Sequence, residues 1–331
     1  MRPHQNKSLA QKGKKALHCL FHEGLGAFFR KMINALRRVV IFFMRGKINA
    51  MQADVREKMH IREMMLSEIP REPAPAIDAT GSVGVHLHLY YPDMLERILS
   101  YLKNIPVGFD LFVSVVQPGT EDEIRRTCSS RLPNLKNCFV ETVPNRGRDV
   151  APLICTFGER LKGYGFICHI HTKRSSYSEC HEGWAEFLYT HLLGSEWMVK
   201  NILSWLSGNV SVVYPPDFLA MENTPDKWLD NLKMTERLLK SEGIAYDLKK
   251  EFPVIEFSQG TMFWARGDYL AKMLSMNLKY EDFPEEPIKP DGTIAHALER
   301  TLLLWDPAFQ RDIIQLFLDK KDKEDYSNER F

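Results

Sequence analysis

The chain has 331 residues, of which 44% are hydrophobic and 26% are charged, as is ordinary for a soluble globular protein. Its net charge is +1, but residues 1–50 carry +10 and the remainder therefore carries −9. This distribution excludes nucleic acid as a general partner of the main part of the protein.

The cysteine pattern indicates a reducing, cytoplasmic setting. None of the six cysteines forms a Cys-x-x-Cys pair, and Cys138, Cys155 and Cys168 lie in apolar runs, as small buried residues do. The most apolar run, at 39–44, is too short to span a bilayer.

The first predicted element is a basic amphipathic helix at residues 26–45. Its apolar residues recur at three- and four-residue steps, with five lysines and arginines between them. Such a helix suits the surface of an anionic membrane, and the alternative is a helix packed on the protein's own core or on a partner. With a charged helix at 51–66, it makes residues 1–66 a basic helical region.

Prolines and small residues at 67–82 predict a linker, so the globular domain is expected to begin near Val83. Strand and helix patterns then alternate, which predicts an α/β fold with a mostly parallel sheet and helices on both faces. Strands are expected at 83–90, 111–116, 137–143 and 165–171, and helices at 92–103, after Thr120 and at 150–162.

The second half is predicted to be more helical. Its expected elements are a helical region at 182–206, strands at 210–214 and 261–265, and a helix at 291–305 capped by Asp291. The domain is expected to occupy 83–317, and a charged tail 318–331.

A polar loop lies between the third strand and the next helix. Gly147 permits close approach of the backbone to a ligand, and Arg146 and Arg148 offer forked donors suited to phosphate oxygens. Asp149 is expected to cap the following helix or to accept from a sugar hydroxyl. The alternative is a well-capped surface turn.

Histidines occur two residues apart on the first strand and again on the fourth, so each pair shares a face of its strand. The pairs are His86 and His88, and His169 and His171. This pattern is typical of metal-dependent hydrolases. In this chain, His296 and Asp291 could complete the set of metal ligands. However, the chain is too short for the eight βα units of such enzymes.

Two later segments carry candidate binding residues. At 258–264 a turn of small residues precedes an apolar strand whose Trp264 could stack on a sugar ring. On the predicted last helix, His296, Glu299 and Arg300 share one side, so the acid is placed to act as a general base. The alternative for the segment at 258–264 is a core strand, and the alternative for the last helix is an ordinary surface helix.

Five segments together resemble one known family. They are HLHLYYPDMLERILSYLKNIPVGFDLFVSV, NRGRDVAPL, ICHIHTKRS, QGTMFWAR and DGTIAHALER, in that order. They resemble the rhamnan synthesis protein F family of glycosyltransferase-like proteins, which act in bacterial cell-surface polysaccharide assembly. The similarity spans roughly residues 83–305 and leaves out the basic N-terminal region.

The resemblance implies a GT-A glycosyltransferase fold and a nucleotide-sugar donor. It also implies action on a lipid-linked or polysaccharide acceptor at the inner face of the cell membrane, with the protein peripheral to that membrane. GT-A enzymes commonly hold a divalent metal with an Asp-x-Asp motif after the fourth strand, where this chain has His169 to Lys173 and no acidic pair.

Cations are therefore expected to neutralise the donor diphosphate without a metal cofactor, and Mg²⁺ or Mn²⁺ is the alternative. The predicted donor-binding residues are Asn145, Arg146, Gly147, Arg148, Asp149, His171, Thr172, Lys173 and Arg174.

Because inverting GT-A enzymes often place an acid near the start of a late helix, the resemblance makes Glu299 the first candidate for the catalytic base and Asp291 the second. The predicted sugar- or acceptor-binding residues are His86, His88, Tyr90, Gly260, Thr261, Trp264, His296 and Arg300. Rhamnose is the sugar that the family name implies. A catalytically inactive glycan-binding assembly subunit remains an alternative, as does the metal-dependent hydrolase.

Overall fold

The computed structural model describes residues 46–71, 81–174, 183–218, 227–289 and 291–322. The chain divides into two units, Met1–Ala50 and Met51–Phe331, and all that follows concerns the second. The predicted membrane-surface helix at 26–45 and most of the predicted charged tail lie outside the described residues, as does most of the predicted linker. Within these described ranges, no helix combines the length and hydrophobicity needed to cross a membrane.

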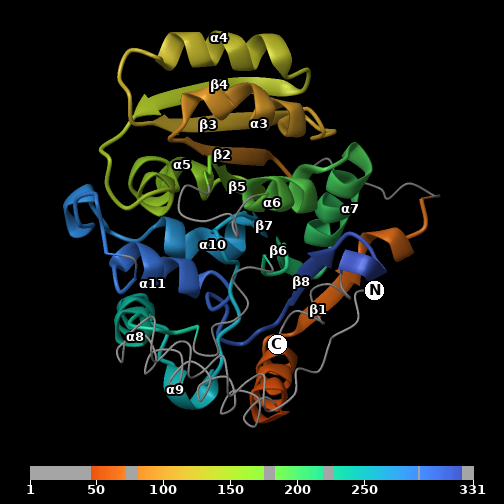
Figure 1. The fold of residues 1–331 in the computed structure, drawn as a ribbon, viewed down its shortest axis with the longest axis vertical. Coiled ribbons are helices and arrows are strands. Elements are labelled where there is room, and N and C mark those ends of the chain that lie inside the picture. Colours follow the sequence, from red (N-terminus) through yellow and green to blue (C-terminus); the bar gives the residue numbers. More distant parts are fainter. Residues whose placement is uncertain (1–45, 72–80, 175–182, 219–226, 290, 323–331) are drawn as a thin grey trace, which may run out of the picture. The chain divides into compact units, whose positions relative to one another are not determined.

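One eight-stranded sheet organises the second unit, in the order β1-β8-β6-β7-β5-β2-β3-β4 (Figure 1). All neighbouring strands are parallel except where β7 pairs, because β7 runs antiparallel to both β5 and β6. The strands are β1 Ile61–Met65, β2 Val83–Leu89, β3 Phe109–Val115, β4 Leu135–Thr142, β5 Phe166–His171, β6 Val210–Tyr214, β7 Phe263–Arg266 and β8 Asp312–Phe317. The predicted α/β fold with a mostly parallel sheet is confirmed.

Helices pack on both faces of the sheet, in two hydrophobic cores. One core contains α3 Leu95–Leu102, α4 Glu121–Arg131, α6 Trp184–Leu193 and α7 Glu196–Ser207. The other contains α5 Gly158–Leu161, α8 Leu232–Ser241, α9 Leu248–Glu251, α10 Gly267–Leu274 and α11 Ile294–Thr301. Short helical turns are η1 Leu66–Glu68, η2 Pro92–Met94, the π-helical η3 Pro152–Thr156, and η6 Tyr280–Asp282.

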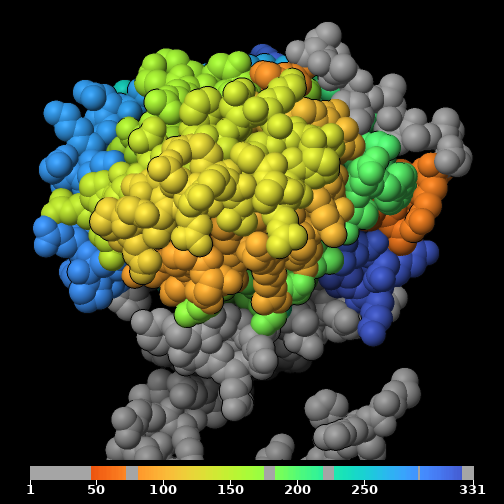
Figure 2. Space-filling view, turned by 90° about the horizontal axis from the view of Figure 1, so that it is seen from above, coloured from red at the N-terminus to blue at the C-terminus, as the bar shows by residue number. Residues whose placement is uncertain are grey.

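The helix α3 shows why these segments fold as they do. Leu95, Ile98, Leu99 and Leu102 recur at three- and four-residue steps, and all four are buried against the sheet. Burying one such side chain stabilises the fold by roughly 1.5–3 kcal/mol. Figure 2 looks onto the β4 end of the sheet, where the yellow residues of α4 and the orange residues of α3 form the surface.

The predicted domain boundary at Val83 is wrong. Residues 51–58 are helical, as expected, but Ile61–Met65 form β1, which pairs in parallel with β8 and extends the sheet. The exposed Arg62 and Glu63 interrupt the apolar residues of this edge strand, so its sequence resembles a charged helix. The globular part therefore begins before the predicted linker.

Three predicted helices also differ in extent. The region at 182–206 divides at Ser195, whose side chain accepts from Met198 N and caps α7. The helix at 150–162 divides into η3 and α5, and the last helix begins at Ile294 with Thr293, rather than Asp291, at its N-cap.

Candidate functional site

A row of polar side chains crosses the face of the sheet that α5 and α11 cover. On β2 and β5 every second residue is apolar and belongs to the opposite core, so the histidines between them share the other face. The parallel register places His86 beside His169 and His88 beside His171. Ser114 on β3 lies beside His88, and all five side chains are buried.

Hydrogen bonds join most of this row into a chain. Ser114 Oγ lies 2.9 Å from His88 Nδ1 and 3.2 Å from His86 Nε2. His86 Nδ1 lies 2.9 Å from His169 Nδ1, and the two ring planes are parallel to within 8°. His169 Nε2 lies 3.1 Å from Asp149 Oδ2. The row therefore ends on a carboxylate of the predicted loop.

The charges of this row follow from its burial. Burial lowers the pKa values of His86 and His169 and lowers that of His88 to about 4, so all three are neutral at pH 7. Burial alone would raise the pKa of Asp149, but the charge of His171 and the hydrogen bond with His169 hold it well below its usual value. Asp149 is therefore ionised.

His171 stands apart from its neighbours because both of its ring nitrogens face carbonyl oxygens. Nε2 lies 2.7 Å from Gly260 O, and Nδ1 lies 3.0 Å from Thr172 O. Since a carbonyl oxygen only accepts, both contacts are hydrogen bonds only when both nitrogens carry a proton. This geometry places His171 between two backbone acceptors, and its charge helps to lower the pKa of the nearby Asp149.

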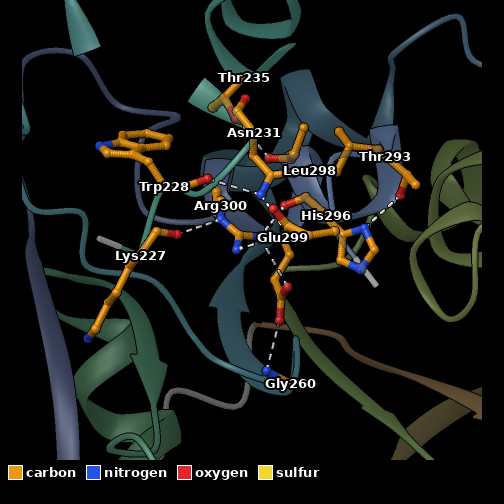
Figure 3. Close-up of polar contacts among 12 residues, drawn as sticks. Lys227, Trp228, Asn231, Thr235, Gly260, Thr293, His296, Leu298, Glu299 and Arg300 are labelled. Carbon is orange, nitrogen blue, oxygen red and sulfur yellow. Dashed lines mark hydrogen bonds and ion pairs between the residues drawn. The ribbon is translucent and has the colours of Figure 1, made fainter. Parts of the chain in front are cut away.

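Gly260 connects His171 to Glu299 on α11. Its carbonyl oxygen accepts from His171. Its N–H donates to Glu299 Oε1 at 2.9 Å, as Figure 3 shows. Burial raises the pKa of Glu299, and the charge of Arg300 opposes this effect. Three predicted site residues, Gly260, Glu299 and His171, therefore lie together.

Two turns at this edge of the sheet have left-handed backbones. Gly260 and Thr261 have φ values of 87° and 55°, and Gly147 and Arg148 have values of 67° and 54°. Such values are unusual for residues other than glycine, above all for a β-branched residue such as Thr261. Backbone strain of this kind is common at functional sites.

Two of the four predicted phosphate-binding cations are paired with acids. Arg146 contacts Glu285, and Arg174 contacts Asp93. Arg174 also lies over the ring of Tyr91. These acids compete with an anionic ligand for the two arginines.

The other two cations have no ion pair among the described residues. Arg148 is exposed, and Lys173 Nζ lies 3.5 Å from the ring centroid of Trp184. Burial lowers the pKa of Lys173, and the carboxylates of Glu299 and Asp149 oppose that shift. Lys173 is therefore electrostatically coupled to both acids of the site.

Two buried polar atoms beside these groups have no partner in the described protein, namely His296 Nε2 and Gln259 Oε1. His296 uses its other nitrogen, which lies 2.8 Å from Thr293 Oγ1, and after burial the charge of Arg148 contributes most to lowering the pKa of His296. Buried groups without partners are rare and mark places where a ligand can bond. The sequence predictions missed Gln259, although its place before Gly260 could have indicated it.

Four predicted site residues take part in structural contacts. Asp291 accepts from Asn231 Nδ2 at 2.7 Å and from Asp230 N at 3.1 Å, so each of its oxygens accepts a hydrogen bond. Its role as the second candidate base stays a prediction. The other three have almost no exposed surface with which to contact a sugar, and they are His86, Trp264 and Arg300.

The partners of these three side chains explain their burial. Trp264 donates its indole N–H to Leu192 O at 3.0 Å, within the core. Arg300 donates to Lys227 O and His296 O, each at 2.9 Å (Figure 3). His86 lies within the hydrogen-bonded row described above.

The remaining predicted residues lie at the carboxyl edge of the strands. Thr172 Oγ1 accepts from the backbone N–H groups of Tyr90 and Tyr91, so it holds the end of β5 against that of β2. Tyr90 and Asn145 are exposed. Only Tyr90 and Asn145 in this group have side chains open to a ligand.

The residues present do not fit a resident divalent metal. In the part of the chain that the structure describes, no three His, Cys, Asp or Glu side chains are grouped to hold a metal ion. His86 and His169 bond to one another, and Asp149 accepts from His169. We therefore assign no chemical step to a metal.

Comparison with known proteins connects the chain to one family. The sequence model of the family described as "Rhamnan synthesis protein F" matches residues 45–308. Two proteins of Xanthomonas campestris pv. campestris, both described as "Uncharacterized protein WxcX", are 27% and 28% identical over 241 residues. The match covers 70% of this chain and 32% of each relative, so the chain spans about a third of the relatives' length.

Solved structures resemble this chain only loosely. A crystal structure of S. aureus TarS 1-349 is 12% identical with a TM-score of 0.36, over 75% of this chain and 63% of that one. The mannosyltransferase Ktr4p from S. cerevisiae is 9% identical with a TM-score of 0.36, over 82% of this chain and 78% of that one. Its complex with GDP is 11% identical with the same score, over 84% and 77%. No residue role follows from these values.

Proposed function

Because the chain belongs to the rhamnan synthesis protein F family, we propose that it is a glycosyltransferase of polysaccharide biosynthesis that uses a nucleotide-sugar donor. One observation supports this proposal more than any other. The carboxylate of Glu299 accepts from Gly260 N, and the carbonyl oxygen of the same residue faces His171, at the carboxyl edge of the parallel strands. In open α/β sheets, ligands bind at this edge.

The cations of the site are proposed to hold the donor diphosphate. Arg148 and Lys173 have no ion pair among the described residues, and both nitrogens of His171 face carbonyl oxygens. As the sugar leaves, negative charge grows on the diphosphate, and fixed cations stabilise it most at that point. Rhamnose is the proposed sugar, because the family is described by rhamnan synthesis.

Glu299 is proposed as the general base. Its carboxylate removes the proton from the acceptor hydroxyl, whose oxygen attacks the anomeric carbon while the bond to the diphosphate breaks. This single displacement inverts the configuration of the sugar. The raised pKa of Glu299 makes its carboxylate a stronger base than an exposed glutamate.

The substitution Glu299→Gln tests this role. An amide oxygen can still accept from Gly260 N, so the variant should keep its fold and bind donor while losing transfer. We expect transfer of labelled rhamnose from dTDP-rhamnose into bacterial membrane lipids to fall at least 100-fold. The melting temperature should not fall, because burial disfavours the ionised carboxylate that the variant lacks.

The matched control is Glu96→Gln, which changes an exposed glutamate on α3. Full transfer activity in Glu299→Gln would remove Glu299 from the mechanism. Donor binding without any transfer in the wild-type protein would instead favour a glycan-binding assembly subunit.

Diphosphate stabilisation is proposed to be independent of a metal. Transfer measured after exhaustive chelation should equal transfer in untreated protein. Complete loss of transfer, with recovery on adding Mg²⁺ or Mn²⁺, would contradict this part of the proposal.

The acceptor is proposed to be a lipid-linked or growing cell-surface glycan, with the protein held at the inner face of the membrane by residues 26–45. The sequence supports this attachment, because apolar residues and arginines alternate there at helical spacing. Sedimentation with vesicles that contain anionic lipid tests it, and equal binding to neutral vesicles would count against it.

A further inference from the structure

The ionised carboxylate of Asp149 determines which atom donates and which accepts in each hydrogen bond of the buried polar row. Asp149 only accepts, so His169 donates to it from Nε2 across 3.1 Å. A neutral His169 then has a bare Nδ1, which must accept. His86 must therefore donate from Nδ1 across the 2.9 Å that separates the two Nδ1 atoms.

The geometry of the two rings supports this bond. Their planes are parallel to within 8°, and their centroids are 4.9 Å apart although the two Nδ1 atoms are only 2.9 Å apart. The rings of His86 and His169 therefore meet nitrogen to nitrogen, as a hydrogen bond between imidazoles requires.

The chain of hydrogen bonds continues to the edge of the sheet. A neutral His86 that donates from Nδ1 must accept at Nε2, so the Ser114 hydroxyl donates to it across 3.2 Å. The oxygen of Ser114 then accepts from His88 Nδ1 across 2.9 Å. Each side chain has one assigned role, and Asp149 determines all of them.

These assigned roles determine the tautomer of His88, the last histidine of β2. With its proton on Nδ1, its Nε2 carries a lone pair, and this atom has no partner among the described residues. His88 lies beside His171 in the register, at the carboxyl edge where the candidate site is found. The residue is 5% exposed, so only a group that enters the site can reach it.

We propose that Asp149 sets the tautomer of His88 through His169, His86 and Ser114, so that His88 Nε2 accepts a hydrogen bond from a hydroxyl of the transferred sugar. The sugar contact rests on the function proposed above, whereas the tautomer relay does not. Ser114, His86 and His169 are positioning residues in this scheme, and His88 is the contact residue.

The burial of so many polar groups is consistent with this role. Three neutral histidines and a serine interrupt a sheet face whose neighbouring residues, such as Phe112 and Ile167, are apolar. Polar groups in such a place weaken a core unless every one is bonded. In this row only His88 Nε2 has no partner within the part of the chain that the structure describes.

Nuclear magnetic resonance of ¹⁵N-labelled full-length protein tests the relay directly. Long-range ¹H–¹⁵N correlations distinguish the two neutral tautomers of a histidine, and His88→Gln identifies the signal of His88 by its loss. At pH 7 we expect His88 to carry its proton on Nδ1. A proton on Nε2, or on both nitrogens, would overturn the relay.

The substitution Ser114→Ala should disconnect His88 from Asp149. Without the hydroxyl, His88 Nδ1 has no acceptor, so the proton should move toward Nε2, as in a histidine free in water. Ser114→Thr keeps a hydroxyl and should restore the wild-type tautomer. Ser211→Ala, at another buried serine on β6, should leave the His88 signal unchanged.

Donor binding by the same variants tests the sugar contact. Ser114→Ala should bind dTDP-rhamnose about 3- to 10-fold more weakly than wild type, which corresponds to the loss of one hydrogen bond, and should bind dTDP equally well. An equal loss for both ligands would contradict the contact. If wild-type protein binds dTDP but not dTDP-rhamnose, both the proposed sugar and the contact of His88 with it are wrong. The tautomer relay is then still tested by the nuclear magnetic resonance spectra.

Discussion

Asp149 is buried and the side chain of Glu299 is 19% exposed, and their surroundings move their pKa values in opposite directions. The charge of His171 and the hydrogen bond with His169 outweigh burial at Asp149, whereas burial outweighs the neighbouring cations at Glu299. Acids whose environments differ in this way commonly divide the chemical roles of a site. Here Asp149 anchors the histidines, and Glu299 is the proposed general base.

The first prediction concerns the stability that Asp149 provides. Asp149→Asn should lower the free energy of unfolding at pH 7 by roughly 2 kcal/mol, because the hydrogen bond between His169 and a charged carboxylate is lost. The pKa of Asp149 is lowered in the folded protein, so its contribution is present above the ordinary pKa of an aspartate and disappears as the pH falls through the folded value.

Urea unfolding of wild type and variant across pH 3 to 8 provides the measurement. The difference between the two proteins should shrink as the pH falls. A constant or growing difference would show that the ionised carboxylate is not the stabilising group.

The sequence was informative about side chains whose chemistry is visible in a motif. Arg148, Lys173 and Glu299 could be named because a polar loop, a strand end and a helix face indicated them. Ser114 and Trp264 could not be judged in the same way, since their roles depend on neighbours from other strands and helices. A serine within the apolar run LFVSVV gives no sign that two histidines will bond to it.

At the scale of elements, the turn before β7 determines the geometry of the site. Gly260 and Thr261 adopt left-handed conformations there, so that the carbonyl oxygen of Gly260 faces His171 while its N–H faces Glu299. β7 itself is the one antiparallel strand of the sheet. The sequence predicted the turn and the strand, but not the reversed direction.

The second prediction concerns Gly260. Gly260→Ala should lower the free energy of unfolding by about 1–2 kcal/mol, the usual cost of a left-handed residue with a side chain. The new Cβ atom would also lie 3.1 Å from Leu188 Cδ1, so the turn should shift and transfer activity should fall.

Gly119→Ala is the matched control, because Gly119 has a φ of 85° and open space around it. Chemical denaturation should show a similar backbone cost in both variants, and only Gly260→Ala should lose activity. Equal activity in the two variants would separate this turn from the site.

An edge strand such as β1 is difficult to recognise because half of its residues face solvent. Arg62 and Glu63 are exposed there, and pairing with β8, which lies about 250 residues further along the chain, is not visible in local periodicity. The central strands β2, β3 and β5 are buried on both faces and were predicted to within a few residues.

For the whole molecule, the third prediction compares two shortened chains. Residues 51–331 keep β1 and the helical residues 51–58 before it, and Val55 and Met59 in this part belong to a hydrophobic core. This chain should unfold at the same urea concentration as the full protein. Residues 83–331 expose β8 as an edge and should be less stable or aggregate.

The longer fragment also separates folding from membrane attachment. Because residues 51–331 lack the basic segment at 26–45, they should fold normally yet no longer sediment with anionic vesicles. If residues 83–331 proved as stable as the full chain, β1 would not be part of the folding unit.

The most direct test of the whole account is a thermal-shift measurement of the full chain with nucleoside diphosphates and nucleotide sugars, in the presence of a chelator. We predict that at least one nucleotide sugar raises the melting temperature of the wild-type protein. In the double variant Arg148→Ala/Lys173→Ala this shift should be lost, and in Arg126→Ala/Lys272→Ala, which removes two exposed charges elsewhere, it should remain. The account would be contradicted if no nucleotide sugar stabilised the wild-type protein, or if both double variants responded as the wild type does.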